Sequence, residues 1–165
     1  MVAINIATLK EGTHDVVLEP EAGDLDLDPE RFEDIRVEAR LDYFDGRIVV
    51  AMRAGATATL ECDRTLQLFK QRLSGSYTML FEPAGEEASD EEEEFQDVRP
   101  LDPWDREIDI TDAVRDTLVL SIPARCIAPG AEDLEIQTQF GEAENEIDPR
   151  WEALAKLRAG QSREE

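Results

Sequence analysis

The chain has 165 residues, with forty acidic and seventeen basic side chains and a net charge of −23. This length suits one compact core and is short for two. The absence of any run of about twenty apolar residues excludes a membrane-spanning helix. The N-terminal sequence also lacks the basic start and long apolar stretch of a signal peptide. We therefore predict a single domain over residues 1–165 in a cytoplasmic protein whose two cysteines stay reduced.

The negative charge is distributed unevenly along the chain. Residues 1–30 carry eight acidic residues and one basic residue, a net charge of −7. Residues 31–82 carry eight of each and are neutral, whereas residues 83–165 carry twenty-four acidic and eight basic residues, a net charge of −16. Because a strongly acidic surface repels nucleic acid, the neutral middle segment is the expected place for any contact with RNA.

Two explanations of the acidity stay open. Only three of the basic residues are lysine, and abundant carboxylates with few lysines are typical of proteins that must remain soluble at high salt. Alternatively, the acidic flanks bind a basic partner such as the tail of a ribosomal protein.

The clearest local pattern is a β-hairpin. Residues 35–43 alternate strictly, with apolar side chains at odd positions and charged side chains at even positions, as in a half-buried strand. Asp45 and Gly46 follow as a two-residue turn, because both central positions of such a turn favour positive φ. Residues 48–52 and 56–62 are then the returning strand or strands.

Two glycines interrupt the strand patterns further along. Gly55 separates the two returning segments and is predicted to mark a bulge or bend. A third alternation over residues 69–81 is broken in the middle by Ser-Gly-Ser at 74–76. One half-buried antiparallel sheet accounts for all of these segments.

Residues 85–94 contain seven acidic residues and no apolar residue except one alanine. Such a segment cannot bury enough surface to offset the entropy lost on ordering. We therefore predict that residues 85–96 form a disordered loop.

A short strand and a helix are predicted after this loop. Residues 107–110 alternate, and Thr111 is then expected to cap a helix whose apolar face is formed by Val114, Leu118 and Ala113. The apolar run after the helix ends at Pro123.

The last part of the chain is less regular. Residues 134–140 allow another short strand, and Asp148 followed by proline is a good helix start. Gly160 ends this C-terminal helix, and residues 160–165 are expected to be a frayed tail. The predicted fold class is therefore α+β, mainly an antiparallel β-sheet with one short internal helix and a C-terminal helix.

The sequence offers little catalytic chemistry. It has no glycine-rich phosphate loop, no nucleophile elbow and no H-x-x-x-H pair. His14 is the only histidine and is more often a partly exposed neutral side chain than a general base in such a setting. We predict a protein that is not an enzyme and needs no cofactor.

Several motifs together resemble a known family. The alternating residues 34–50, LECDR at 60–64, an acidic insertion, EIDITDAVRDTLVLSIP at 107–123 and DPRW at 148–151 follow one another in the order seen in the large ribosomal RNA accumulation protein family, YceD. Each motif alone is degenerate, whereas their order and spacing are more specific. The resemblance covers residues 35–157.

The cysteines depart from the pattern of that family. In the family the position of Cys62 commonly opens a C-x-x-C pair, but here Thr65 stands at the second position. Only Cys126 remains after Pro123, without a partner at the same spacing. Because structural zinc requires four soft or imidazole ligands, we predict no metal and two free thiols, with a Cys62–Cys126 contact as a conceivable remnant.

The resemblance implies a factor that supports accumulation of large-subunit ribosomal RNA through ribosome biogenesis. Its expected partner is that RNA or a pre-ribosomal particle. The alternative is an acidic, chaperone-like binder of a basic ribosomal protein that makes no RNA contact.

Basic side chains in the neutral segment, together with the start of the C-terminal helix, are the candidate contacts to RNA or to a protein partner. The candidates are Arg36, Arg40, Arg47, Arg53, Arg64, Lys70, Arg72, Arg150 and Trp151. For the strand arginines the competing interpretation is cross-strand pairing with Glu38 and Asp42. For Trp151 it is packing of the helix onto its own sheet.

Overall fold

A computed structural model describes residues 1–83 and 97–134 of the chain. The chain divides into two compact units, Met1–Asp133 and Leu134–Glu165, and the fold described here is that of the first. Its elements in chain order are β1 (Ala3–Asn5), β2 (Gly12–Leu18), the short 3-10 helix η1 (Ala22–Leu25), β3 (Phe32–Phe44), β4 (Arg47–Glu61), β5 (Leu68–Pro83), β6 (Val98–Leu101), β7 (Glu107–Asp109) and α1 (Thr111–Leu120).

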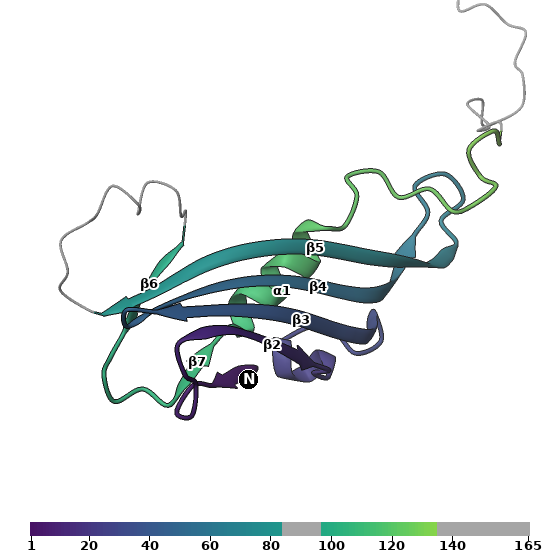
Figure 1. Ribbon diagram of the computed structural model, residues 1–165. Coiled ribbons are helices and arrows are strands. Elements are labelled where there is room, and N and C mark those ends of the chain that lie inside the picture. Colours follow the sequence, from purple (N-terminus) through teal and green to yellow (C-terminus); the bar gives the residue numbers. More distant parts are fainter. Residues whose placement is uncertain (84–96, 135–165) are drawn as a thin grey trace, which may run out of the picture. The chain divides into compact units, whose positions relative to one another are not determined.

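A five-stranded sheet in the order β2-β3-β4-β5-β6 dominates this unit (Figure 1). Its first four strands are antiparallel, as the alternating patterns predict, whereas β6 pairs in parallel with the end of β5. A separate antiparallel pair, β1 and β7, buries Ile4 and Ile108 in the same hydrophobic core. Within the described residues, no helix is long and apolar enough to cross a membrane.

The hairpin between β3 and β4 confirms the turn prediction. Asp45 and Gly46 have φ values of 52° and 77°, and Phe44 pairs with Arg47 across the turn. Positive φ at both central positions matches the right-handed twist of the two strands. This turn fixes the register of the β3–β4 pair, and the register determines the face on which each side chain lies.

The predicted bulge at Gly55 is wrong, because β4 runs without interruption through this residue. The irregularity lies in the neighbouring strand, where the β3–β4 register shifts between Glu33 and Arg36. Asp34 has a φ of 53° there, as expected where one strand carries an extra residue. The bulge therefore lies directly before Arg36, which pairs with Gly55.

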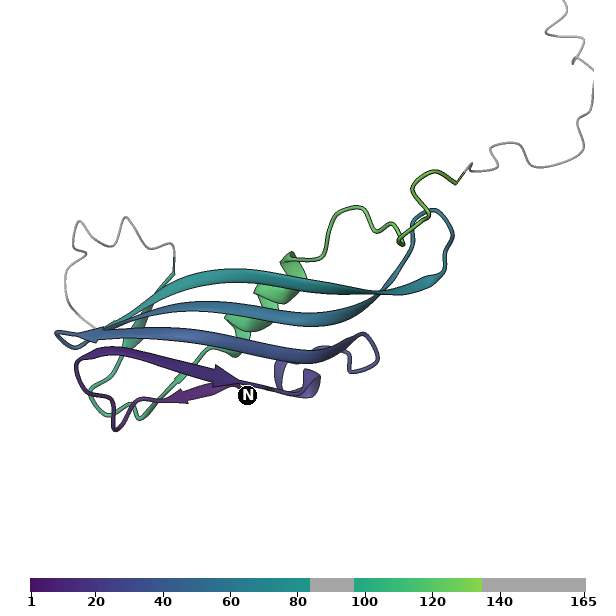
Figure 2. The same ribbon diagram turned by 45° about the vertical axis from the view of Figure 1, so that its right-hand side comes forward.

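One face of the large sheet is covered by α1, which crosses behind β3, β4 and β5 (Figures 1 and 2). Ala113, Val114 and Leu118 are buried on the helix, which confirms its predicted apolar face. Burying a leucine side chain such as that of Leu118 contributes about 1.5–3 kcal/mol. We call the sheet face under α1 the inner face and the opposite one the outer face.

The Ser-Gly-Ser interruption of the alternation at residues 74–76 does not interrupt the strand, because β5 is continuous from Leu68 to Pro83. A Cβ atom on Gly75 would lie 2.7 Å from Cγ2 of Thr117 and 3.2 Å from its carbonyl oxygen. Glycine is therefore present at this position because the helix backbone lies directly against the strand.

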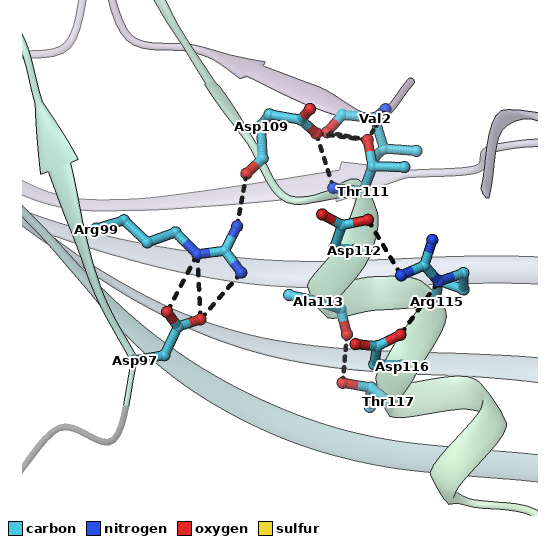
Figure 3. Close-up of polar contacts among 10 residues, drawn as sticks. All are labelled: Val2, Asp97, Arg99, Asp109, Thr111, Asp112, Ala113, Arg115, Asp116 and Thr117. Atoms are coloured by element: carbon cyan, nitrogen blue, oxygen red, sulfur yellow. Dashed lines mark hydrogen bonds and ion pairs between the residues drawn. The ribbon is translucent and has the colours of Figure 1, made fainter. Parts of the chain in front are cut away.

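The helix start differs from the prediction that Thr111 is its cap (Figure 3). Thr111 is the first residue of α1, and its backbone N–H donates to Oδ1 of Asp109 at 2.8 Å. The Thr111 hydroxyl donates to the same carboxylate and accepts the backbone N–H of Val2 at 2.7 Å. The N-cap is Ile110, which forms no side-chain cap hydrogen bond. The Asp109 carboxylate instead accepts the first N–H of the helix, and Thr111 ties the N-terminal segment to the helix.

This arrangement makes the stability of the fold depend on the ionisation of Asp109. Burial disfavours its charged form, but the hydrogen bonds from Thr111, together with the positive charges of the N-terminus and Arg99, lower the pKa of Asp109 below its ordinary value. A depressed pKa stabilises the folded state above the ordinary value, and the stabilisation is lost as the pH falls through the folded-state pKa.

We expect Asp109→Ala to lower the free energy of unfolding by about 1.5–3 kcal/mol at pH 7, the usual contribution of hydrogen bonds to a charged group. The difference from the unmodified protein should disappear in strongly acidic solution, where the carboxylate is protonated in both states. Denaturant unfolding followed by circular dichroism at several pH values measures this. A difference that persists at low pH would show that Asp109 acts through packing alone.

Several predictions lie outside the described residues. They are the acidic loop at 85–96, the strand at 134–140, the C-terminal helix beginning at Asp148 and the tail at 160–165.

Candidate nucleic-acid interface

The strand register brings five of the predicted basic residues onto the outer face of the sheet. The five are Arg36 and Arg40 on β3, Arg53 on β4, and Lys70 and Arg72 on β5. Across the β3–β4 pair, Arg36 is opposite Gly55, Arg53 is opposite Glu38 and Arg40 is opposite Ala51. Across the β4–β5 pair, Arg72 is opposite Thr57 and Lys70 is opposite Thr59. All five basic residues are exposed, because side chains on alternate residues of a strand point to the same face. Residues from three strands, separated in sequence, therefore form one surface.

Three of these cations are already paired with carboxylates. Arg36 contacts Oε1 of Glu19 at 2.7 Å and Oε1 of Glu38 at 3.2 Å, and the hydrogen bond to Glu38 raises the pKa of Arg36. Arg40 contacts Oδ1 of Asp15 on β2 at 3.3 Å.

Lys70 pairs with Glu33 in the same way. For Arg36, Arg40 and Lys70, the structure therefore supports the ion-pair interpretation. Asp42, the other expected partner, instead accepts the hydroxyl of Thr13 at 2.6 Å.

Arg53 and Arg72 are different. Within residues 1–83 and 97–134, neither guanidinium group forms a hydrogen bond or an ion pair with another residue. A guanidinium group presents a planar set of donors that matches the geometry of a phosphate group. These two arginines can therefore bind an anion without first breaking an intramolecular ion pair.

The two arginines border a depression of about 270 Å³ in the outer face. Gly55 is at its centre, with Arg36 opposite it on β3 and Ser74 opposite it on β5. The lining residues are Arg36, Glu38, Arg53, Ala54, Gly55, Arg72, Leu73 and Ser74. Gly55 and Ser74 were not among the predicted site residues, although a glycine within a regular strand is itself a signal of close approach by a ligand.

The other predicted residues do not join this surface. Arg47 is at the far end of β4, where its Nε is 3.8 Å from Oε2 of the buried Glu82. Arg64 lies in the turn between β4 and β5, and its Nη1 is within 3.5 Å of the carbonyl oxygen of Ala131. Arg150 and Trp151 lie outside the described residues.

One known family matches the part of the chain that contains most of this surface. The family model described as large ribosomal RNA subunit accumulation protein YceD matches residues 50–158. The chain belongs to the YceD family. No curated protein and no solved structure shows a significant match to the chain.

The family match begins at Val50, later than the resemblance over residues 35–157 suggests. The YceD match therefore includes Arg53 and Arg72, which have no ion-pair partner among the described residues, and starts after Arg36 and Arg40, which are ion-paired.

The turn after β4 holds one of the two cysteines of this YceD protein. Sγ of the buried Cys62 accepts the backbone N–H of Ala128 at 3.3 Å. This hydrogen bond, followed by one from the Thr65 hydroxyl, lowers the pKa of Cys62 to about 7 despite burial.

The chain around Cys126 lies against this turn. The backbone N–H of Asp63 donates to the Cys126 carbonyl oxygen at 2.8 Å, and Oδ2 of Asp63 accepts the Cys126 N–H at 2.7 Å. Both thiols are free. Within the described part of the chain, no three His, Cys, Asp or Glu side chains are grouped to hold a metal ion.

Proposed function

We propose that this YceD protein supports accumulation of large-subunit ribosomal RNA as a non-enzymatic factor that contacts RNA through the outer face of its sheet. The observation that carries the proposal is the pair of exposed arginines on the outer face, Arg53 and Arg72, that have no ion-pair partner in the described residues. They belong to the neutral segment of a chain whose net charge is −23.

Phosphate contacts supply most of the affinity of proteins for RNA when no base is read. An extended sheet face with a few arginines can contact several phosphates along a strand, while its neighbouring carboxylates limit affinity for unrelated polyanions. Binding of this kind weakens steeply as salt rises. The phenyl ring of Phe44 is 62% exposed at the tip of the β3–β4 hairpin and offers a surface for base stacking.

The chemistry of the described residues supports a role in binding. The Nε2 atom of His14 is 2.7 Å from the carbonyl oxygen of Lys10, so this ring nitrogen is already engaged with backbone. A general base must lie within hydrogen-bonding reach of the proton that it abstracts.

The proposal predicts that the protein sediments with large-subunit precursors. In a sucrose gradient of cell lysate, we expect the tagged protein to co-migrate with precursor particles and not with mature ribosomes. The association should weaken as salt is raised, because the entropy gained by releasing counterions from the RNA falls as the salt concentration rises. If the protein stays at the top of the gradient at every salt concentration, residence on the precursor is excluded, and an acidic binder of a free ribosomal protein becomes the better explanation.

A further inference from the structure

Gly55 is the feature of the outer face that the fold itself does not explain. Its φ is not positive, so its backbone conformation is open to any residue. A Cβ atom there would meet only the carbonyl oxygen of Leu73, at the ordinary contact distance of 3.6 Å. A glycine within a strand destabilises it, because glycine loses more conformational freedom on folding than other residues. The position would therefore accept a larger side chain, and the absence of one requires another reason.

The surroundings of Gly55 supply that reason. Arg36 and Ser74 flank it in the same row of the sheet, on β3 and β5. Arg53 lies two residues before it on β4, and Arg72 lies two residues before Ser74 on β5. Since β4 and β5 are antiparallel, the two arginines lie on opposite sides of this row. Three long side chains thus surround a position that has none, which leaves the depression of about 270 Å³.

The bulge in β3 adds to this arrangement. It lies between Glu33 and Arg36, directly before the arginine that faces Gly55. Bulges change the direction of the side chains that follow them and are frequent beside binding sites.

The charge of the depression suits an anion. Its lining holds three arginines and one carboxylate, that of Glu38. Glu38 is itself bound by Nε of Arg36 at 3.2 Å, which neutralises part of its charge. The Ser74 hydroxyl adds a neutral donor at the rim.

We propose that the depression above Gly55 is a subsite for one phosphate group, held by Arg53 and Arg72 with support from Arg36 and Ser74. This inference rests on the proposed function, since the phosphate is taken to be a phosphodiester of RNA. The absence of a side chain at Gly55 lets the phosphate approach the sheet closely enough for both free arginines to reach it.

The test fills the depression without removing any charge. In Gly55→Thr the new side chain occupies the space between the arginines. Ala51→Thr provides the matched control, because it introduces the same side chain at a position that is exposed on the same face of β4, opposite Arg40. Both variants should fold, and Gly55→Thr should be at least as stable as the unmodified protein because threonine favours strands.

The readout is binding of transcribed large-subunit ribosomal RNA as a function of salt. We expect Gly55→Thr to weaken binding roughly tenfold, which corresponds to about 1.4 kcal/mol. The slope of log affinity against log salt should fall by about 0.7–0.9, the contribution of one phosphate contact. Ala51→Thr should leave both quantities unchanged.

The outcomes separate the two proposals. If the unmodified protein does not bind RNA, the proposed function fails and the RNA subsite fails with it. If RNA binding is intact in Gly55→Thr but lost when Arg53 and Arg72 are reversed, the proposed function stands and the subsite is overturned. A titration with inorganic phosphate, in which the Gly55 amide is followed by NMR, shows whether the site binds a phosphate group of RNA or a free small anion. A shift with phosphate but none with RNA would show a site for a small anion and overturn the RNA assignment.

Discussion

Reversal of both free arginines, in the double variant Arg53→Glu and Arg72→Glu, is expected to weaken binding of large-subunit ribosomal RNA about a hundredfold or more. A hydrogen bond to a charged group contributes about 1.5–3 kcal/mol, and a hundredfold change in affinity corresponds to about 2.7 kcal/mol. Replacement by glutamate also repels the phosphate backbone. Filter binding at several salt concentrations measures the loss.

In this double variant, Arg53→Glu places a second carboxylate directly opposite Glu38, a like-charge pair that costs up to about 1 kcal/mol. Arg72→Glu should change the stability little, because Arg72 has no hydrogen-bond or ion-pair partner in the described residues. Surface substitutions of that kind usually fall within about 0.5 kcal/mol. Reversal of Arg36 or Arg40 would be harder to interpret, because it would also break ion pairs. The ion-pair partners are Glu19 and Glu38 for Arg36 and Asp15 for Arg40.

The control is Arg106→Glu, which makes the same charge change at an exposed position between β6 and β7. It should leave RNA binding nearly unchanged. Equal losses in Arg106→Glu and in either single variant of the outer face would indicate a nonspecific effect of net charge. Full binding by the double variant would exclude the outer face as the RNA contact.

Local sequence patterns were sufficient to predict the strands β3, β4 and β5 and the sheet face on which their side chains lie. The strict alternation in residues 35–43 and the turn at Asp45-Gly46 determine the register, because a shift of one residue would expose every apolar side chain of β3. The same pattern correctly places Arg36 and Arg40 on the solvent side.

Which arginines remain free could not be predicted from the sequence. Glu38, an expected partner, lies two residues from Arg36 on the same strand. The other partners of Arg36, Arg40 and Lys70 come from β2, from the segment after β2 and from the start of β3. Their identity depends on pairing between strands that are distant in sequence, and no local pattern encodes it. The parallel pairing of β6 is unpredictable for the same reason, since its four residues include a proline and show no clear alternation.

Glycine within a strand was the most ambiguous signal. It is compatible with a bulge, with a break, or with close approach of another group. Gly55 was predicted to mark a bulge or bend, and Gly75 lies where the alternation of its segment is interrupted, but both residues lie in continuous strands. Only the three-dimensional structure shows that α1 approaches one of them and that the other opens onto solvent.

The second large effect is expected at Gly75. In Gly75→Ala the new methyl group would lie 2.7 Å from Cγ2 of Thr117, closer than van der Waals contact allows. Because the carbonyl oxygen of Thr117 is only 3.2 Å away, α1 itself must move. Overpacking of this kind costs about 1–3 kcal/mol, and it outweighs the usual gain of about 0.5–1 kcal/mol on replacing a strand glycine by alanine.

A double-mutant cycle with Thr117→Ser tests that the helix contact is the cause. Serine lacks the clashing methyl group but keeps the hydroxyl that donates to the Ala113 carbonyl oxygen at 2.6 Å. The loss of stability caused by Gly75→Ala, measured by denaturant unfolding, should therefore be smaller when Thr117 is serine. Gly55→Ala, where the nearest atom is 3.6 Å away, should be neutral or stabilising. If Gly75→Ala proves as harmless as Gly55→Ala, α1 does not pack against β5 as closely as the structure shows.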